Sequence, residues 1–305
     1  MSKTVKNPYL LHMFNATSHV SPFDVNMAYE GQFDGVIPYT EVSLQDIHTL
    51  TQDTIFSRGP KGVKRTCIFI GGREFGMAID MLHRARAAMV PPFEVSVFAD
   101  PSGAITTAAA LIACIEVWVK NKTGGTLEGK NLHILGGTGP VGTCAGILAS
   151  NCGANVYLVS HRGKAAGQSA ADEYNDRFKV HMQGEDFGSN EAILNFLKES
   201  HIVIGSAKAG IRVISKEQLQ QAPELLVAAD LNAVPPSGIE GVDVQDFGKE
   251  IDFTPQKAAG IGALAIGNVK YKVHHRLFEM MRETDTPLYL DHEKAFETAR
   301  IYAAK

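Results

Sequence analysis

Cysteine is scarce in this chain of 305 residues, and no two cysteines have the C-x-x-C spacing of a metal or redox pair. The four that occur, Cys67, Cys114, Cys144 and Cys152, each lie in an apolar segment. This usage is typical of reduced core residues in a reducing compartment, and it argues against a disulfide framework and a zinc site. We therefore expect a cytoplasmic protein without a bound metal.

The sequence also lacks a long hydrophobic run and an excess of one charge. Its longest apolar stretch, 108–119, contains Glu116 and is too short to span a bilayer, and the first eight residues lack a signal-peptide core. The net charge is −4, without a long run of Lys and Arg. We expect no membrane and no nucleic-acid partner. The hydrophobic content of 45% is enough for a core in each of two domains.

A glycine-rich turn between an apolar run and a helix-like segment is the most informative feature that is present. Residues 131–135 predict a strand, residues 141–150 predict a helix, and the turn between them reads G-x-G-x-x-G. A second strand at 155–160 completes a βαβ unit of about 30 residues. The unit predicts a dinucleotide site in which the pyrophosphate contacts Gly137, Thr138, Gly139, Pro140, Val141 and Gly142.

The end of the second strand indicates which dinucleotide is bound. An Asp or Glu at this place holds the ribose 2′-hydroxyl of NAD, whereas this chain reads Ser-His-Arg-Gly-Lys at 160–164. A hydroxyl and cations suit a 2′-phosphate, so we expect NADP to be preferred, with NAD as the alternative. The residues expected there are Ser160, His161, Arg162 and Lys164. The other interpretation of these cations is a solvated surface loop.

Strand and helix patterns alternate along the rest of the chain. Buried strands are predicted at 66–70, 94–99, 178–182, 201–205 and 225–229. The polar segment 121–125 is typical of a linker between domains.

We therefore expect a two-domain α/β fold. Residues 126–269 are expected to form a Rossmann-type doubly wound parallel sheet that binds NAD(P). Residues 1–125 and 270–305 are expected to form a smaller, discontinuous α/β domain, with the substrate in a cleft between the two domains.

Ligands of open α/β sheets bind beyond the carboxyl ends of the strands, so the residues that follow each strand are candidates. In the second domain, small and polar residues there predict the nicotinamide site at Ala207, Asn232 and Pro235. In the first domain, the corresponding polar groups are Arg73, Asp100, Ser102, Thr106 and Thr107. The other interpretation of Ser102, Thr106 and Thr107 is that they only cap the start of a helix. Residues 262–268 predict a flexible return before a cationic segment in which Lys270 and His274 share one helix face.

Several motifs together resemble one family, the methylene-tetrahydromethanopterin dehydrogenases of methylotrophic bacteria. The motifs are Phe23-Asp24, Ser57-Arg58-Gly59 and the segments 100–110, 136–142, 230–239 and 270–274. The resemblance covers nearly the whole chain. It implies oxidation of N5,N10-methylene-tetrahydromethanopterin to the methenyl form with NADP or NAD, in one-carbon (formaldehyde) oxidation, by a homo-oligomer such as a trimer or hexamer.

The resemblance also implies where the pterin is bound. Lys270 is the position expected to contact it near the reacting carbon, with Asp24 and Asp100 orienting it. Further substrate contacts are expected from Lys272, Ser102, Thr106, Thr107 and Arg58.

A Tyr-x-x-x-Lys pair is absent, since none of the eight tyrosines has Lys four residues later. The bifunctional folate enzymes use this pair for cyclohydrolase activity, and the short-chain dehydrogenases use it to oxidise hydroxyl groups. We therefore expect a dehydrogenase without cyclohydrolase activity. Two alternatives stay open: a methylene-tetrahydrofolate dehydrogenase that uses NADP, and a non-catalytic NADP sensor.

Overall fold

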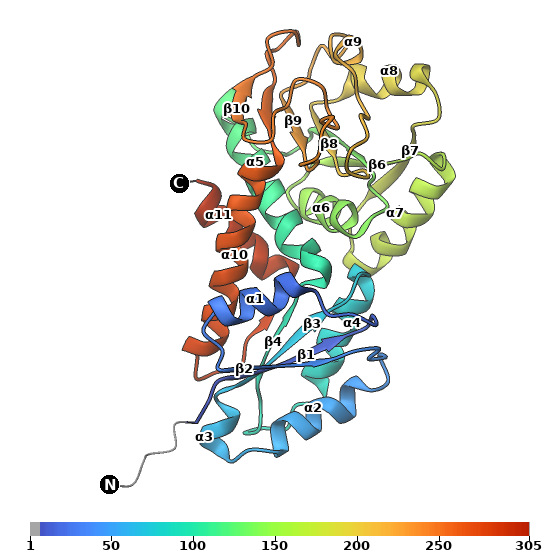
Figure 1. Ribbon diagram of the computed structural model, residues 1–305. Helices are drawn as coiled ribbons and strands as arrows, with labels where there is room; N and C mark the ends of the chain where they lie inside the picture. Colours follow the sequence, from blue (N-terminus) through green and yellow to red (C-terminus); the bar gives the residue numbers. More distant parts are fainter. Residues whose placement is uncertain (1–6, 305) are drawn as a thin grey trace. The chain divides into compact units, whose positions relative to one another are not determined.

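The computed structural model describes residues 7–304, which form two compact units with one β-sheet each (Figure 1). The first unit runs up to Thr106 and includes Tyr271–Thr298, and the second contains Thr107–Lys270 and the chain from Ala299 onward. The segment 121–125, expected as a linker, is instead the end of helix α5 (Ala104–Thr123) and the turn after it. Asn121, Lys122 and Thr123 continue the helix, and the chain turns only at Gly124, which has a φ of 71°.

The first unit contains a five-stranded, entirely parallel sheet in the order β12-β4-β3-β1-β2. Strands β3 and β4 confirm the patterns at 66–70 and 94–99, and every residue in them is buried. The other three strands were not predicted, and β12 has only two residues, too few to carry a pattern. The bounds are β1 Leu10–Asn15, β2 Gly35–Tyr39, β3 Thr66–Gly71, β4 Ser96–Ala99 and β12 Tyr289–Leu290.

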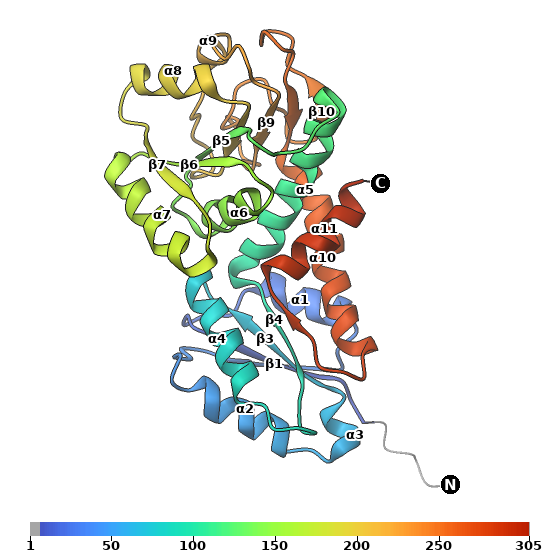
Figure 2. The same cartoon turned by 180° about the vertical axis from the view of Figure 1, so that it is seen from behind.

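Helices cover both faces of this sheet. Helices α2 (Ile47–Phe56) and α4 (Phe75–Ala87) lie on one face, and α1 (Pro22–Glu30) lies on the other with the second half of α10 (Ala263–Glu283) (Figures 1 and 2). On the α10 face, the rings of Phe69, Phe98 and Phe278 pack with centroids 5.3–5.6 Å apart. This aromatic cluster is the core on that face. The short helix α3 (Pro60–Val63) precedes β3.

The second unit contains a seven-stranded sheet in the order β10-β11-β9-β8-β5-β6-β7, and it confirms the expected doubly wound α/β fold. All its neighbouring strands are parallel except β10, which is antiparallel to β11. The bounds are β5 Asn131–Leu135, β6 Asn155–Ser160, β7 Met182–Asp186, β8 Ile202–Gly205, β9 Val227–Asp230, β10 Phe247–Glu250 and β11 Ala259–Ile261.

One predicted strand was placed too early. Residues 178–182 were expected to form it, but Phe178 ends helix α7 (Lys164–Phe178) and the strand is β7 at 182–186. The reason is local: Lys179 ends the helix in the left-handed conformation, with a φ of 56°, and Phe178 packs on Tyr174 within the helix. An apolar residue at a helix end was read as the start of a strand.

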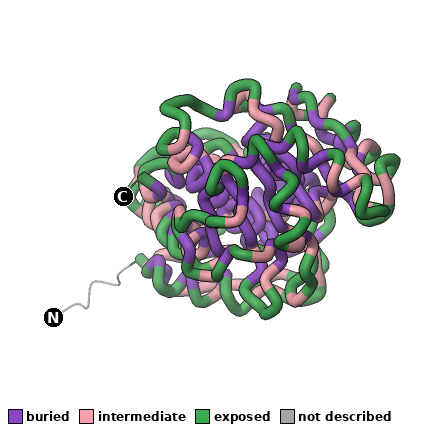
Figure 3. Tube along the Cα trace, turned by 90° about the horizontal axis from the view of Figure 1, so that it is seen from above, coloured by how far each residue is buried: buried purple, intermediate pink, exposed green. Residues whose placement is uncertain are grey.

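Helices α6 (Pro140–Asn151) and α7 cover one face of the second sheet, and α8 (Asn190–Glu199) and α9 (Lys216–Leu219) cover the other (Figures 1 and 2). A glycine lets α7 approach strand β6 closely, because a Cβ on Gly167 of α7 would lie 2.4 Å from the carbonyl oxygen of Leu158 in β6. On the opposite face, Phe196 and Leu197 of α8 join a core with Leu135, Val159 and Val203. Figure 3 shows the buried segments gathered in the interior.

Two long helices differ from the sequence-based expectation. Residues 262–268 were expected to be a flexible return, but α10 begins at Ala263 and includes most of them. The chain from Pro101 to Thr123 is long and apolar enough to cross a membrane by length and composition, and 72% of its apolar window is buried inside the protein. That burial is typical of a core helix. The last helix is α11 (His292–Ala303), and a 3₁₀ turn, η1 (Pro101–Gly103), precedes α5.

Candidate functional site

The glycine-rich turn links β5 to α6 in a backbone arrangement that excludes larger residues. The amide of Gly137 donates to the carbonyl oxygen of Ile134 at 3.0 Å, and the amide of Gly139 donates to that of Gly136 at 3.0 Å. A Cβ on Gly142 would lie 2.7 Å from the Cα of Gly137, and a Cβ on Gly137 would lie 2.8 Å from the oxygen of Ile134. Real Cβ atoms do not approach backbone this closely, so these positions require glycine.

The N-terminus of α6 fits the pyrophosphate of a dinucleotide. Gly139 is the N-cap residue and Pro140 follows it, so the free first-turn amides are those of Val141 and Gly142. Thr143 fixes the turn, because its hydroxyl donates to the carbonyl oxygen of Gly139 at 2.8 Å. Free amides and the positive end of the helix dipole suit phosphate oxygens. The residues present therefore fit NAD or NADP.

The expected 2′-phosphate residues lie together at the end of β6 and in the turn after it. Ser160 is 1% exposed and its hydroxyl accepts from the amide of Arg162 at 3.2 Å, whereas His161, Arg162 and Lys164 are exposed. The structure adds a residue that the sequence analysis missed: the carboxylate of Glu185 lies 3.7 Å from the ammonium group of Lys164. Glu185 belongs to β7, which pairs with β6. No carboxylate residue directly follows β6 in the sequence, but Glu185 and Asp186 of the neighbouring strand lie opposite its last two residues.

The residues expected near the nicotinamide lie in loops after β8 and β9. Ala207 is close to the glycine-rich turn, since a Cβ on Gly136 would lie 2.8 Å from its amide nitrogen. The side chain of Asn232 accepts from the amides of Gly210 and Val234 at 3.1 and 2.9 Å, so it organises its own loop. Asn232 and Pro235 line one cavity of about 560 Å³.

Asp230, the last residue of β9, also stabilises this loop through hydrogen bonds to its backbone. Its carboxylate accepts from the amides of Asn232 and Ile239 at 3.0 and 3.1 Å. Burial raises the pKa of Asp230, and these amide donors oppose that rise. The sequence analysis did not select Asp230, although it directly follows the alanines of a predicted strand.

A second cavity, of about 460 Å³, lies in the first unit. It collects two expected substrate residues, Asp24 and Ser102, and also Arg73, a candidate named for its place after a strand. Asn15 lines the same cavity, and the sequence analysis did not select it. Asp24 is 3% exposed. Ser102 has a left-handed φ of 52°, and its hydroxyl donates to the carbonyl oxygen of Gly72 at 2.7 Å.

This first-unit cavity lies at the carboxyl ends of β1 and β3, where ligands of parallel sheets bind. Asn15 is the last residue of β1, and its amide nitrogen donates to the hydroxyl of Thr17 at 2.9 Å. The sequence feature that could have pointed to Asn15 is the short, mostly apolar run Leu-Leu-His-Met-Phe at 10–14, which forms the strand that Asn15 ends.

Asp100 and Thr106 do not line that cavity, because both are fully buried. Asp100 accepts from the amides of Ile105 and Thr106 at 2.9 and 3.1 Å and from the hydroxyl of Thr106 at 2.6 Å, so it caps the start of α5. His274, also fully buried, places its Nδ1 3.1 Å from the same carboxylate. The geometry gives Asp100 and Thr106 a structural role in place of the expected contact with substrate.

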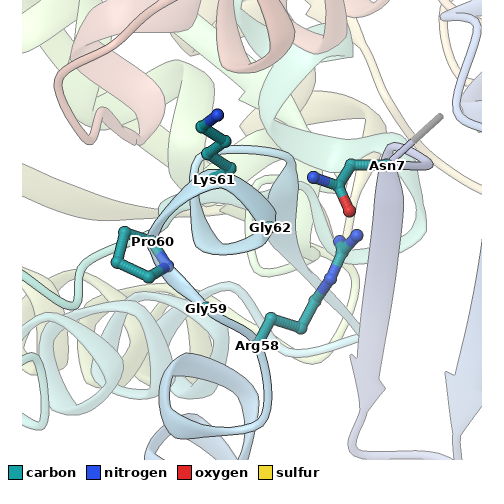
Figure 4. A pocket seen from close by; sticks show the side chains of 6 residues that line it. All are labelled: Asn7, Arg58, Gly59, Pro60, Lys61 and Gly62. Atoms are coloured by element: carbon teal, nitrogen blue, oxygen red, sulfur yellow. The ribbon is translucent and has the colours of Figure 1, made fainter. Parts of the chain in front are cut away.

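Arg58 lines a different cavity, together with Asn7 and residues 59–62 (Figure 4). Its guanidinium donates to the carbonyl oxygens of Pro8 and Arg65 and to the hydroxyl of Thr66, at 2.9–3.3 Å. These partners lie at the amino ends of β1 and β3, opposite the cavity that holds Asp24. Arg58 therefore links the amino ends of β1 and β3 through hydrogen bonds.

Three more expected residues lie on α5 and α10, two helices that each have residues in both units. Thr107 of α5 and Lys270 of α10 are half-buried, and Lys272 is exposed. Lys270 and His274 are one helical turn apart on α10. Among residues 7–304, no group of three or more His, Cys, Asp and Glu side chains could hold a metal ion.

Residues 22–102 match the family model described as "Methylene-tetrahydromethanopterin dehydrogenase, N-terminal". A Methylorubrum extorquens protein named "NAD(P)-dependent methylenetetrahydromethanopterin dehydrogenase" is 42% identical over 95% of this chain and 97% of its own length. The chain belongs to the methylene-tetrahydromethanopterin dehydrogenase family. This confirms the resemblance inferred from the motifs. A second Methylorubrum extorquens relative, "Bifunctional protein MdtA", is 32% identical over 96% of this chain and 99% of its own length.

Two solved structures align with this chain over nearly its whole length. Shikimate 5-dehydrogenase from Listeria monocytogenes, in complex with shikimate and NAD, aligns with a TM-score of 0.51 over 97% of this chain and 98% of its own. The NAD-dependent malic enzyme from Thermotoga maritima aligns with a TM-score of 0.54 over 96% of this chain and 84% of its own. Each is only 12% identical, so the likeness concerns the fold alone.

Proposed function

We propose that this member of the family oxidises N5,N10-methylene-tetrahydromethanopterin to N5,N10-methenyl-tetrahydromethanopterin, with NADP as the preferred acceptor and NAD as the alternative. The step belongs to the oxidation of one-carbon units such as formaldehyde. The observation that carries the proposal is the intact glycine-rich turn, with Gly137 and Gly142 held in backbone contact, in a chain 42% identical to a relative of that name. The folate carrier is not favoured, because the relative at 42% identity is named for the methanopterin carrier.

The reaction requires little chemistry from side chains. The hydride leaves a carbon between two nitrogens, whose lone pairs stabilise the cation that forms, so the redox step needs no strong general base. NAD(P) supplies the hydride acceptor when bound. The protein's task is to hold two rings face to face at reacting distance. The glycine turn and the amides at the start of α6 fix one of the two partners.

For the pterin, we propose Asp24 and Ser102, which line one cavity, together with Lys270 and Lys272 of α10. A carboxylate such as Asp24 accepts hydrogen bonds from the amino and ring N–H groups of a pterin. A cationic Lys270 beside a carbon that becomes positive would oppose the reaction. We therefore assign Lys270 a hydrogen bond to a pterin oxygen or nitrogen.

We further propose a cytoplasmic homo-oligomer. Cys67, Cys114 and Cys144 are buried, as is usual for reduced core cysteines in a reducing compartment. Burial raises the pKa of the Cys67 and Cys114 thiols to about 12. Sedimentation would distinguish a trimer or hexamer from a monomer.

The test is to follow the reduction of NADP and of NAD by absorbance with purified protein and two carriers, methylene-tetrahydromethanopterin and methylene-tetrahydrofolate. We expect fast turnover with the methanopterin and a higher kcat/KM with NADP than with NAD. Faster turnover with the folate would reassign the carrier. No turnover with either carrier, despite measurable NADPH binding, would instead support the sensor alternative.

A further inference from the structure

We propose that Glu185 weakens the preference of this enzyme for NADP, by opposing the 2′-phosphate of NADP and competing with it for Lys164. The inference rests on the proposed function, since it concerns the same dinucleotide site. It adds a carboxylate from a neighbouring strand to a site for which the sequence predicted only a hydroxyl and cationic residues. Glu185 would thereby keep NAD usable in a site equipped for NADP.

The position of Glu185 follows from the pairing of β6 with β7. In the parallel register, Glu185 lies opposite Val159 and Asp186 lies opposite Ser160. Neighbouring strands are about 4.8 Å apart, so the backbone of Glu185 lies within one strand spacing of the end of β6. The 2′-substituent of the adenosine ribose is bound at that end in this class of fold.

The carboxylate of Glu185 is held in place. Its Oε1 accepts from the amide of Asp186 at 2.8 Å, and its Oε2 lies 3.7 Å from Nζ of Lys164. The backbone beneath is also fixed, because Gln168 of α7 accepts from the amide of Gly184 at 2.9 Å. A Cβ on Gly184 would lie 2.6 Å from the carbonyl oxygen of Lys164, so the start of α7 packs directly on β7.

The two members of the ion pair differ in freedom. The Glu185 side chain is 27% exposed, whereas that of Lys164 is 66% exposed. Lys164 can therefore turn to a phosphate while Glu185 stays where its backbone holds it. A 2′-phosphate adds a charge of about −1.5 to −2 near this fixed carboxylate, and repulsion across a few ångströms of solvated surface changes binding by about three- to tenfold.

With NAD, Glu185 does not meet this repulsion. The ribose then carries a neutral 2′-hydroxyl, which can donate a hydrogen bond to a carboxylate, and Lys164 keeps its pairing with Glu185. The pair therefore favours neither cofactor strongly. Removing the charge of Glu185 is expected to make the site more selective for NADP.

The experiment measures the dissociation constants of NADPH and NADH by fluorescence titration for the parent protein and for Glu185→Gln, which keeps the shape and removes the charge. We expect Glu185→Gln to bind NADPH about three- to tenfold more tightly, with NADH binding unchanged or weaker. Lys164→Met is expected to weaken NADPH more than NADH. The kcat/KM ratio for NADP over NAD is expected to follow the ratio of dissociation constants.

The matched control is Glu250→Gln. Glu250 forms a similar surface ion pair, 3.1 Å from Lys122, on β10 at the other end of the strand order from β7. It reports the effect of removing one negative charge far from the site.

A ratio of NADPH to NADH affinity that changes less than twofold in Glu185→Gln, or as much in Glu250→Gln, would overturn the inference and leave the proposed function standing. Absence of NADPH and NADH binding to the parent protein would overturn the proposed function itself, and this inference with it.

Discussion

His133 shows how a titratable residue becomes part of a core. It is 3% exposed, and its ring stacks between Tyr157 and Phe196 with centroid distances of 4.5 and 5.0 Å. The hydroxyl of Ser200 donates to the carbonyl oxygen of Phe196, so His133 Nδ1 donates to the Ser200 oxygen at 2.8 Å. Burial lowers the pKa of His133 to about 3. The ring is therefore neutral in the folded protein at physiological pH.

A pH dependence of stability follows from this shift. The unfolded chain takes up a proton at His133 below about pH 6.5, whereas the folded chain does so only near pH 3. As the pH is lowered, the free energy of unfolding should therefore decrease by up to about 1.4 kcal/mol per pH unit, and by about 1.6 kcal/mol from pH 6.5 to 5.0 because of this residue. His133→Leu should be less stable at pH 7.5, because it loses the bond to Ser200, and should lose less stability on acidification.

Urea unfolding at pH 7.5, 6.5 and 5.0 measures this difference in slope. The exposed His181→Leu in the same unit controls for loss of an imidazole from the surface. Equal slopes for His133→Leu and the parent protein would contradict the assignment.

Lys270 is the residue on which the proposed substrate site depends most. Lys270→Ala removes a charge-assisted hydrogen bond to the pterin, worth about 1.5–3 kcal/mol, so kcat/KM for the pterin should fall by about ten- to a hundredfold. NADPH binding should stay intact. Steady-state kinetics and NADPH titration measure the two effects, with Lys198→Ala on the exposed face of α8 as control. Unchanged pterin kinetics would refute the role of Lys270.

At the scale of elements, the unit β5-turn-α6 depends on one glycine contact. A Cβ on Gly142 would meet the Cα of Gly137 at 2.7 Å and the oxygen of Gly136 at 2.9 Å, and these are backbone atoms that cannot turn aside. Gly142→Ala must therefore shift the turn away from the helix. We expect at least tenfold weaker NADPH binding and a loss of about 1–3 kcal/mol in stability, as for other overpacked sites.

Fluorescence titration and thermal unfolding of Gly142→Ala measure both effects. Gly125→Ala is the matched control, since its added Cβ would come no closer than 3.4 Å to a neighbouring atom, a hydroxyl. Parent-like NADPH affinity in Gly142→Ala would show that the turn tolerates the shift and that the pyrophosphate binds elsewhere.

At the scale of the whole molecule, cofactor binding should increase the stability of the folded protein. A ligand at a hundred times its dissociation constant adds about 2.7 kcal/mol to the free energy of unfolding of the unit that binds it. For a unit of the size of the second, this corresponds to a rise in Tm of about 5–10 °C with NADPH. Scanning calorimetry with and without saturating NADPH measures it. No shift at saturation would contradict a dinucleotide site in the folded protein.

The sequence by itself determined the features that are local along the chain. The strand at 131–135, the turn with its three glycines, helix α6 and strand β6 follow one another within about 30 residues, so pattern and spacing were sufficient. The family also followed from the sequence, because its motifs are read position by position.

Only the tertiary structure decided which distant residues meet. It placed Glu185 beside Lys164, collected Asn15, Asp24 and Ser102 around one cavity, and put Arg58 at the opposite end of the same sheet. The physical reason is that strand pairing and burial join residues far apart in sequence. The pairing of β6 with β7 and the two-residue strand β12 depend on contacts that no local pattern contains.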